Sequence, residues 1–313
     1  MHGIDAPMVD RRGAVRDRPV ATQAQAEMLH AIGRAAAGAL VDELALAPKP
    51  GLVSFVDSGS HADMDAQTFM RSIHALRPYF ADIAALGHAR AGFDRLQACG
   101  QAAETRMLAA TGGVNTHRGA VFMLGLLCAG AGALVRDGRP VQPGALREAV
   151  QRHWGAALRA RSTQSTQLPG DVARRRYGLA GAAHEAAHGF PTLFAVVWPA
   201  LNRGLERGLA PDAARLDALF HAMAVLDDTN LAHRGGLAGL RHVQRAARGF
   251  LDAGGAARPG GRAAAQALHA DLVRRHLSPG GAADTLAAAC WVQRVRTLAD
   301  PARAGAAAPC VTA

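Results

Sequence analysis

The sequence predicts an all-α fold, a single domain built from many helices. β-Branched residues are scarce, no alternating strand pattern occurs, and Ala, Leu, Arg, Glu and Gln fill long windows. Half of the 313 residues are hydrophobic and 19% are charged, which is typical of a folded globular chain. This length supports a sizeable core, and no shift in composition calls for a second domain.

Residues that start and stop helices set the predicted boundaries. Thr22 and Asp65 are suitable N-caps, and Pro48 and Pro50 end the first helix. The polar segment 162–170 is expected to be a mobile surface loop. Helices are predicted at 22–46, 65–77, 91–110, 117–136, 144–160, 171–188, 191–207, 211–226, 231–252, 261–277 and 280–299.

The termini and the cysteines suggest a cytoplasmic protein. Residues 1–20 form an expected flexible basic tail with no apolar core of a secretory signal, and 303–313 a second tail, leaving 21–302 as the all-helical domain. No long apolar run predicts a membrane span. The four cysteines are far apart without a C-x-x-C pair, which argues against a disulfide framework or a cysteine zinc site.

The charge balance predicts an anionic ligand. Lys and Arg number 35 against 25 Asp and Glu, a formal net charge of +10. Only 4% of the residues are aromatic, which argues against a nucleic-acid partner because single-strand binders stack bases on aromatic rings.

The segment Glu43 to Asp65 (ELALAPKPGLVSFVDSGSHADMD) is the first that suggests chemistry. Lys49, the only lysine of the chain, lies between two prolines, and a loop with Ser60, His61 and Asp63 follows. Glycine and serine let backbone N–H groups approach an anion, the lysine offers a charge to phosphate, and carboxylates suit magnesium. The alternative is a solvated loop of Asx and Ser turns.

Two further segments, TGGVNTHRGA at 111–120 and DDTNLAHRGG at 227–236, echo each other. Each places an asparagine, a histidine, an arginine and a glycine at a predicted helix start, where free N–H groups attract anions. Asp227 and Asp228 add two adjacent acids. Helix capping alone explains one acid and one cap residue, whereas the whole set favours a metal and phosphate site.

A fourth segment, YGLAGAAHEAAHGFP at 177–191, contains His184-Glu185-x-x-His188. This is the H-E-x-x-H pattern in which two histidines on one helix face bind zinc and the glutamate acts as base. The glycine and proline that follow end the helix at once, and no third ligand is evident beyond Glu206. A chance match in an alanine-rich chain with 14 histidines is the competing interpretation.

Together, in this order, the four segments resemble the triphosphoribosyl-dephospho-CoA synthase family over about residues 25–250. The stretch LVSFVDSGSH at 52–61 is most similar to its malonate decarboxylase branch. Arg118 stands where many relatives carry lysine. The matching residues are Glu43, Pro48 to Val53, Gly59 to His61, Asp63 to Asp65, Gly113 to Gly119, Gly178, Gly181, Glu185-Ala186, Gly189 to Pro191, Asp228 to Asn230 and Arg234 to Gly236.

The resemblance implies a reaction between ATP and 3′-dephospho-CoA. The product, 2′-(5″-triphosphoribosyl)-3′-dephospho-CoA, forms with loss of adenine and is the precursor of the prosthetic group of an acyl carrier protein. A phosphoribosyl-dephospho-CoA transferase acting on that carrier protein is the implied partner. By analogy with glycoside chemistry, inversion at C1″ implies a single displacement with a carboxylate base and an acid near the leaving group.

The site residues are assigned accordingly, as hypotheses. The base is expected among Asp63, Asp228, Glu43 and Glu185, and magnesium among Asp63, Asp65, Asp227 and Asp228. Phosphate is expected at Lys49, His117, Arg118 and Arg234, with Ser60 and His61 in the same site, and Asn115 and Asn230 orient ribose or water. The alternatives are a helical magnesium-dependent hydrolase of ADP-ribose-type substrates and, with less support, an H-E-x-x-H zinc peptidase.

Overall fold

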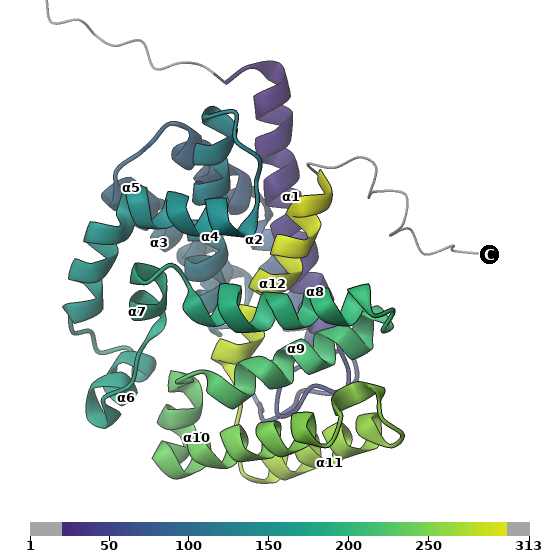
Figure 1. Cartoon of the computed structure of the whole chain (residues 1–313). Coiled ribbons are helices and arrows are strands. Elements are labelled where there is room, and N and C mark those ends of the chain that lie inside the picture. Colours follow the sequence, from purple (N-terminus) through teal and green to yellow (C-terminus); the bar gives the residue numbers. More distant parts are fainter. Residues whose placement is uncertain (1–20, 299–313) are drawn as a thin grey trace, which may run out of the picture.

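The computed structural model describes residues 21–298, and every regular element in that range is helical (Figure 1). The predicted all-α fold is therefore confirmed. The two predicted tails, 1–20 and 303–313, lie outside the described residues.

The first half of the chain forms a bundle around one apolar helix. Its helices are α1 (Gln23–Ala45), α2 (Ala66–His88), α3 (Phe93–Ala110), α4 (Arg118–Arg136) and α5 (Pro143–Thr163). Helix α2 packs against α1, α3 and α4. Thr22 starts α1 with a capping box and Asp65 caps α2 by accepting from the Thr68 backbone N–H, as predicted.

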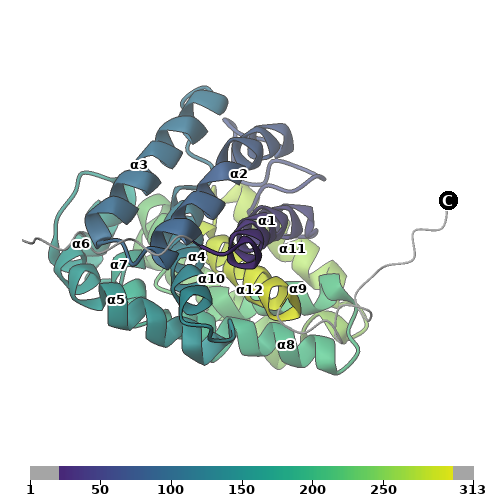
Figure 2. The same cartoon turned by 90° about the horizontal axis from the view of Figure 1, so that it is seen from above.

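The second half wraps around the base of this bundle and returns to it. Its elements are α6 (Pro169–Tyr177), α7 (Ala182–Ala187), a π-helical turn (Thr192–Val197), α8 (Trp198–Glu206), α9 (Pro211–Val225), α10 (Thr229–Asp252), a 3₁₀ turn (Gly255–Ala257), α11 (Gly261–Arg274) and α12 (Gly280–Leu298). The last helix, α12, packs against α1, α4 and α9, so the first and last helices of the chain are neighbours (Figures 1 and 2).

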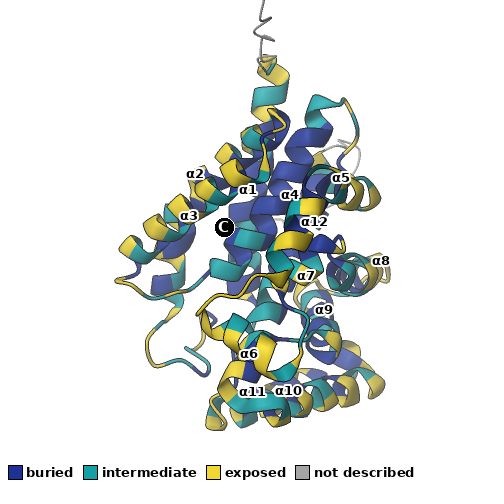
Figure 3. Ribbon diagram, turned by 90° about the vertical axis from the view of Figure 1, so that its left-hand side faces the viewer, coloured by how far each residue is buried: buried dark blue, intermediate teal, exposed yellow. Residues whose placement is uncertain are grey.

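Helix α4 is the buried centre of the molecule, as its dark ribbon shows in Figure 3. Glycines let α2 approach it closely: an added Cβ would lie 1.9 Å from the Ala129 carbonyl oxygen at Gly87 and 1.9 Å from the Ala84 carbonyl oxygen at Gly132. Among described residues, α4 alone is long and apolar enough to cross a membrane, and most of it is buried inside the bundle.

Helix α2 continues well past its predicted end at residue 77. Pro78 lies inside it and removes one backbone hydrogen bond. The residues beyond it, Tyr79, Phe80 and Ile83, are buried against the core, and the Tyr79 hydroxyl donates to the Val121 carbonyl. Burial of these side chains outweighs the local cost of the proline.

Several other helix boundaries differ from those predicted, and glycines account for two of the differences. The helix predicted over 171–188 is two helices, since Gly178 adopts a left-handed conformation that ends α6. Helix α10 begins at Thr229 instead of 231 and bends at Gly236, whose φ is +62°. The loop predicted over 162–170 is shorter: α5 runs to Thr163 and α6 begins at Pro169, with exposed residues between them.

Candidate functional site

The proline-flanked corner buries the single lysine of the chain. After α1 ends, Lys49 folds back so that its Nζ donates to Glu43 Oε1 at 2.5 Å and to the Glu43 carbonyl oxygen at 2.9 Å. Lys49 is 1% exposed. Burial lowers the pKa of Lys49 and raises the pKa of Glu43, and the charge of each partner opposes that shift in the other. A buried ammonium requires such a partner, which explains why the two residues occur together.

His117, in the segment 111–120, lies beside this pair. It is the N-cap residue of α4, and its Nδ1 is 2.6 Å from the Ser72 hydroxyl, which also accepts from Thr116. The ring is buried against the edge of Phe69. Burial, and then the Lys49 charge, lower the pKa of His117 to about 3, so the imidazole is neutral. Its Nε2 is buried with no hydrogen-bond partner among the described residues.

Asp228, in the segment 227–236, links the start of α10 to the last helix, α12. Its Oδ1 accepts from the backbone N–H groups of Asn230 (2.9 Å) and Leu231 (3.2 Å), and its Oδ2 accepts from the N–H of Ala282 (3.1 Å). The carboxylate thus caps α10 and contacts the first turn of α12. Burial raises the pKa of Asp228 to about 6, and the backbone donors act against that rise.

Asp284 on α12 completes the cluster, although the sequence analysis did not select it. Its carboxylate lies directly on Gly119 of α4, where an added Cβ would be 1.9 Å from Oδ2. Burial raises the pKa of Asp284 well above its ordinary value, and the charges of Glu43 and Asp228 raise it further. One signal was present: Asp284 is the only acid between Gly280 and Leu298, in a helix that is otherwise largely apolar.

A second group of contacts forms the rim of the site. It links the segment 43–65 to Arg234 in the segment 227–236. The Ser60 hydroxyl donates to the Leu277 carbonyl at 2.6 Å, and His61 Nε2 is 2.9 Å from the Ser278 hydroxyl. Arg234 donates to the Ser60 carbonyl and contacts His61 Nδ1 at 3.2 Å. Asp63 is an exposed neighbour of His61 at 3.8 Å.

The polar residues at the starts of α4 and α10 are more open. Asn115 is exposed and its Oδ1 accepts from the Arg118 backbone N–H, while Arg118 Nε donates to Glu104 at 3.0 Å. Asn230 is exposed and its side-chain amide lies beside Gly280, where a Cβ would be 2.6 Å from Nδ2. Both arginine and amide groups therefore have surface that a ligand can reach.

The remaining candidate acids bond to local groups. Asp65 accepts from Thr68 at the start of α2, and Asp227 Oδ2 accepts from the Ala180 N–H at 3.1 Å. Glu185 accepts from both the backbone N–H and the hydroxyl of Thr192. Within residues 21–298 no three His, Cys, Asp or Glu side chains form a group that could hold a metal ion.

The H-E-x-x-H segment has the geometry of a helix end. His184 and His188 are exposed, with ring centroids 4.1 Å apart, and His188 Nδ1 is 2.8 Å from the His184 carbonyl oxygen. Because no third ligand lies with them in the described part of the chain, the geometry gives the zinc-peptidase alternative no support.

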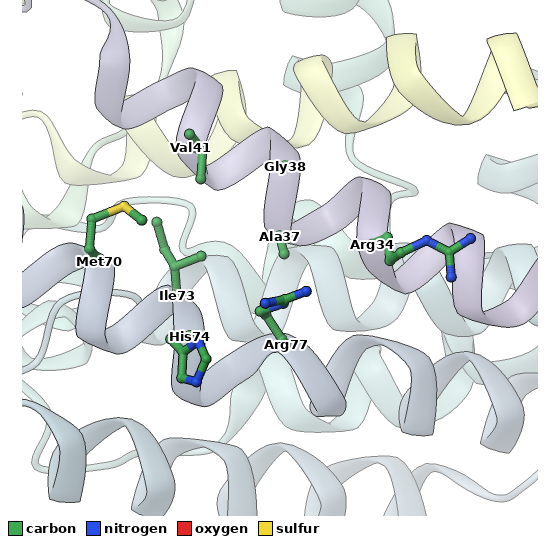
Figure 4. Close-up of a pocket in the computed structure, with 8 residues that line it drawn as sticks. All are labelled: Arg34, Ala37, Gly38, Val41, Met70, Ile73, His74 and Arg77. Carbon is green, nitrogen blue, oxygen red and sulfur yellow. The ribbon is translucent and has the colours of Figure 1, made fainter.

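A pocket occurs elsewhere, between α1 and α2. Figure 4 shows the residues that line it: Arg34, Ala37, Gly38 and Val41 come from α1, and Met70, Ile73, His74 and Arg77 come from α2. It contains none of the motif residues, so the candidate site is the cluster around Asp284 and its rim.

Comparison with known proteins identifies relatives along most of the chain. Residues 29–301 match the sequence model of the ATP:dephospho-CoA triphosphoribosyl transferase family. A 2-(5''-triphosphoribosyl)-3'-dephosphocoenzyme-A synthase of Klebsiella pneumoniae is 41% identical, over 87% of this chain and 92% of its own length. Probable synthases of the same name are similar in Azotobacter vinelandii (40%; 84% and 90%) and Vibrio cholerae (38%; 82% and 85%). No solved structure matches.

Proposed function

This chain belongs to the ATP:dephospho-CoA triphosphoribosyl transferase family and is a transferase, and we propose that it joins the triphosphoribosyl group of ATP to the 2′-hydroxyl of 3′-dephospho-CoA. The product is 2′-(5″-triphosphoribosyl)-3′-dephospho-CoA, and adenine leaves. In this step the bond between the hydroxyl oxygen and C1″ forms while the bond from C1″ to the base breaks.

The observation that carries this proposal is the meeting of motif residues at three helix starts. Asp228 accepts from the first turns of α10 and α12, and Asp284 of α12 lies on Gly119 in the first turn of α4. Helix N-termini with basic side chains nearby favour polyphosphate, and both substrates carry it. The triphosphate stays on the sugar, so it serves as a handle that holds C1″ in place.

The basic residues differ in how they can contact phosphate. Arg118 and Arg234 are partly or fully exposed and present guanidinium groups beside the starts of α4 and α10, suited to bidentate phosphate contacts. Lys49 is buried with Glu43, and His117 is neutral, so we propose that these two shape the floor of the site. Asn115 and Asn230 then orient the ribose.

The described carboxylates do not fit a dedicated magnesium site. Asp63 is exposed, Asp65 caps α2, Asp227 bonds to Ala180, and Asp228 is fully engaged with backbone donors. These acids form no group that could hold a metal ion. We therefore propose that these residues do not hold magnesium by themselves and that the ion enters with the triphosphate of ATP.

The proposed biological role follows from the resemblance of residues 52–61 to the malonate decarboxylase branch. The product would pass, in the cytoplasm, to a phosphoribosyl-dephospho-CoA transferase that loads the acyl carrier protein of malonate decarboxylase. Growth on malonate of a strain that lacks its own synthase, with and without this chain, tests the branch.

The reaction is tested with purified protein, ATP and 3′-dephospho-CoA. Mass spectrometry should find the triphosphoribosylated product together with an equal amount of free adenine. Triphosphoribose released to water would instead support the hydrolase alternative. Asp63→Asn and Asp228→Asn test the carboxylates in the same assay: full activity in both variants contradicts a catalytic role for either.

A further inference from the structure

Three carboxyl groups meet at the floor of the site, and two of them are already held by the protein. Glu43 forms a 2.5 Å contact with the ammonium of Lys49. Asp228 accepts three backbone N–H bonds from α10 and α12. Each is buried, so neither can reach a substrate without giving up these bonds and leaving buried donors unpaired.

Asp284 differs from both neighbours. It forms no ion pair with a basic side chain among the described residues, and the backbone N–H of Ala120 is its one hydrogen-bond donor there. The residue is half-buried, and its carboxyl lies against Gly119 in the first turn of α4. A glycine at position 119 is what allows the carboxyl to occupy this place.

A second observation is an unpaired nitrogen two residues before Gly119, the residue that Asp284 contacts. His117, one residue before α4 begins, is 3% exposed, and its buried Nε2 has no hydrogen-bond partner among the described residues. The charge of Lys49 acts on this ring, Lys49 is bonded to Glu43, and the charge of Glu43 acts in turn on Asp284. An unpaired buried nitrogen is costly, and a bound substrate that supplies its partner removes that cost.

On the basis of the proposed function, we infer that Asp284 is the catalytic acid that protonates the departing adenine. As the bond from C1″ to N9 of the base breaks, the carboxyl proton of Asp284 passes to a ring nitrogen of adenine. The 2′-hydroxyl of 3′-dephospho-CoA bonds to C1″ and releases its proton to solvent. The carboxylate left on Asp284 then regains a proton from water, which restores the enzyme to its initial state.

The electrostatic surroundings suit a donor. Burial raises the pKa of Asp284 well above the ordinary value, and the negative charges of Glu43 and Asp228 raise it further, which favours the protonated form that a proton donor requires. Proton donation by a positioned side chain contributes about 10²–10⁴-fold to a rate.

The test compares two leaving groups in the wild type and in Asp284→Asn, which keeps the size of the side chain. With ATP, Asp284→Asn should lower kcat by about 10²-fold or more and change KM little. With 7-methyl-ATP, whose purine is already cationic and leaves without protonation, the two proteins should differ by less than about tenfold after the enzyme-free loss of base is subtracted. Asp252→Asn, an exposed acid at the end of α10, is the matched control and should resemble the wild type with both substrates.

A second readout on the wild type does not depend on how the variant folds. With ATP, kcat should fall on the alkaline side as the acid loses its proton, and with 7-methyl-ATP that limb should be absent. An equal defect of Asp284→Asn with both substrates, wild-type kcat in that variant, or an alkaline limb that persists with 7-methyl-ATP would overturn the role of Asp284. If the wild type released no adenine from ATP and 3′-dephospho-CoA, the proposed function itself would fail.

Discussion

The floor of the site and its rim use similar residue types in opposite ways. On the floor, Glu43 and Lys49 are buried and bonded to each other. On the rim, Arg118 and Glu104 form an ion pair that stays about 30% exposed, and Asp63 is 64% exposed. Water screens the rim charges, whereas the charge of Lys49 lowers the pKa of His117 and the charge of Glu43 raises that of Asp284. The floor therefore fixes protonation states, while the rim is free to exchange water for ligand.

The largest expected effect comes from breaking the floor pair. Lys49→Met leaves the Glu43 carboxylate buried without a partner, which should lower the free energy of unfolding by about 3–5 kcal/mol in urea denaturation. Arg139→Met, which breaks an exposed ion pair with Glu148 away from the site, is the control and should cost less than about 1 kcal/mol. Similar losses in the two variants would contradict the distinction between a buried and an exposed ion pair.

Lys49→Arg tests the shape of the same place while keeping its charge. The planar guanidinium is larger than the ammonium that fits between the two Glu43 oxygens, so adenine release should fall severalfold or more. Full activity in this variant would show that the corner requires only a positive charge.

The pH dependence of stability separates buried from exposed histidines. The pKa of His117 is lowered to about 3, so its contribution to stability is complete above the ordinary value near 6.5 and is lost as the pH falls toward 3. In urea denaturation between these pH values, His117→Asn should lose less stability than the wild type. His30→Asn, an exposed position on α1, should keep the wild-type dependence. Parallel curves for all three proteins would refute a buried neutral imidazole.

Gly119→Ala should displace the Asp284 carboxyl by adding a Cβ to the start of α4. The new Cβ would meet Asp284 Oδ2 at 1.9 Å and displace the carboxyl, so we expect a loss of about 1–3 kcal/mol in stability and a fall in kcat of at least tenfold. Gly144→Ala in α5, where a Cβ meets nothing within 4 Å, is the control. Thermal denaturation and the adenine assay measure both, and a normal kcat in the Gly119→Ala variant would contradict the contact.

The smallest effect on stability is expected at the rim. Asp63→Asn removes an exposed charge and should change the free energy of unfolding by less than about 0.5 kcal/mol. Any fall in its activity would then be a direct effect on substrate. A large loss of stability would show that Asp63 belongs with the buried group.

Local signals predicted most of the helices, and tertiary contacts explain the exceptions. Thr22 and Asp65 cap their helices through their own side chains, so their positions can be inferred from neighbours in the chain. Helix α2 crosses Pro78 because buried residues beyond it pack against α4, and no local rule contains that information. Gly178 could have indicated the break after α6, since helices commonly end in a left-handed glycine.

The sequence motifs select several residues that the structure brings close together, and the roles of these residues stay predictions. Lys49, His117 and Asp228 stand out by rarity or motif, and all three lie in or beside the floor. The burial of these three side chains depends on tertiary packing, which the motifs do not encode. Asp284 belongs to no motif, and its importance appears only once α12 is placed against Gly119.

The position of α12 has a consequence for how the protein is made. A ribosome synthesises the helices in order, so α1, α4 and α10 leave it before α12, which packs against α1 and α4 and donates the Ala282 N–H to Asp228. Until then the Asp228 carboxylate lacks its Ala282 donor, and Asp284 does not yet exist. A chain that ends before α12 thus contains all four motif segments but lacks the helix that completes the packing around them. We therefore expect the protein to become active only when its last helix has been synthesised.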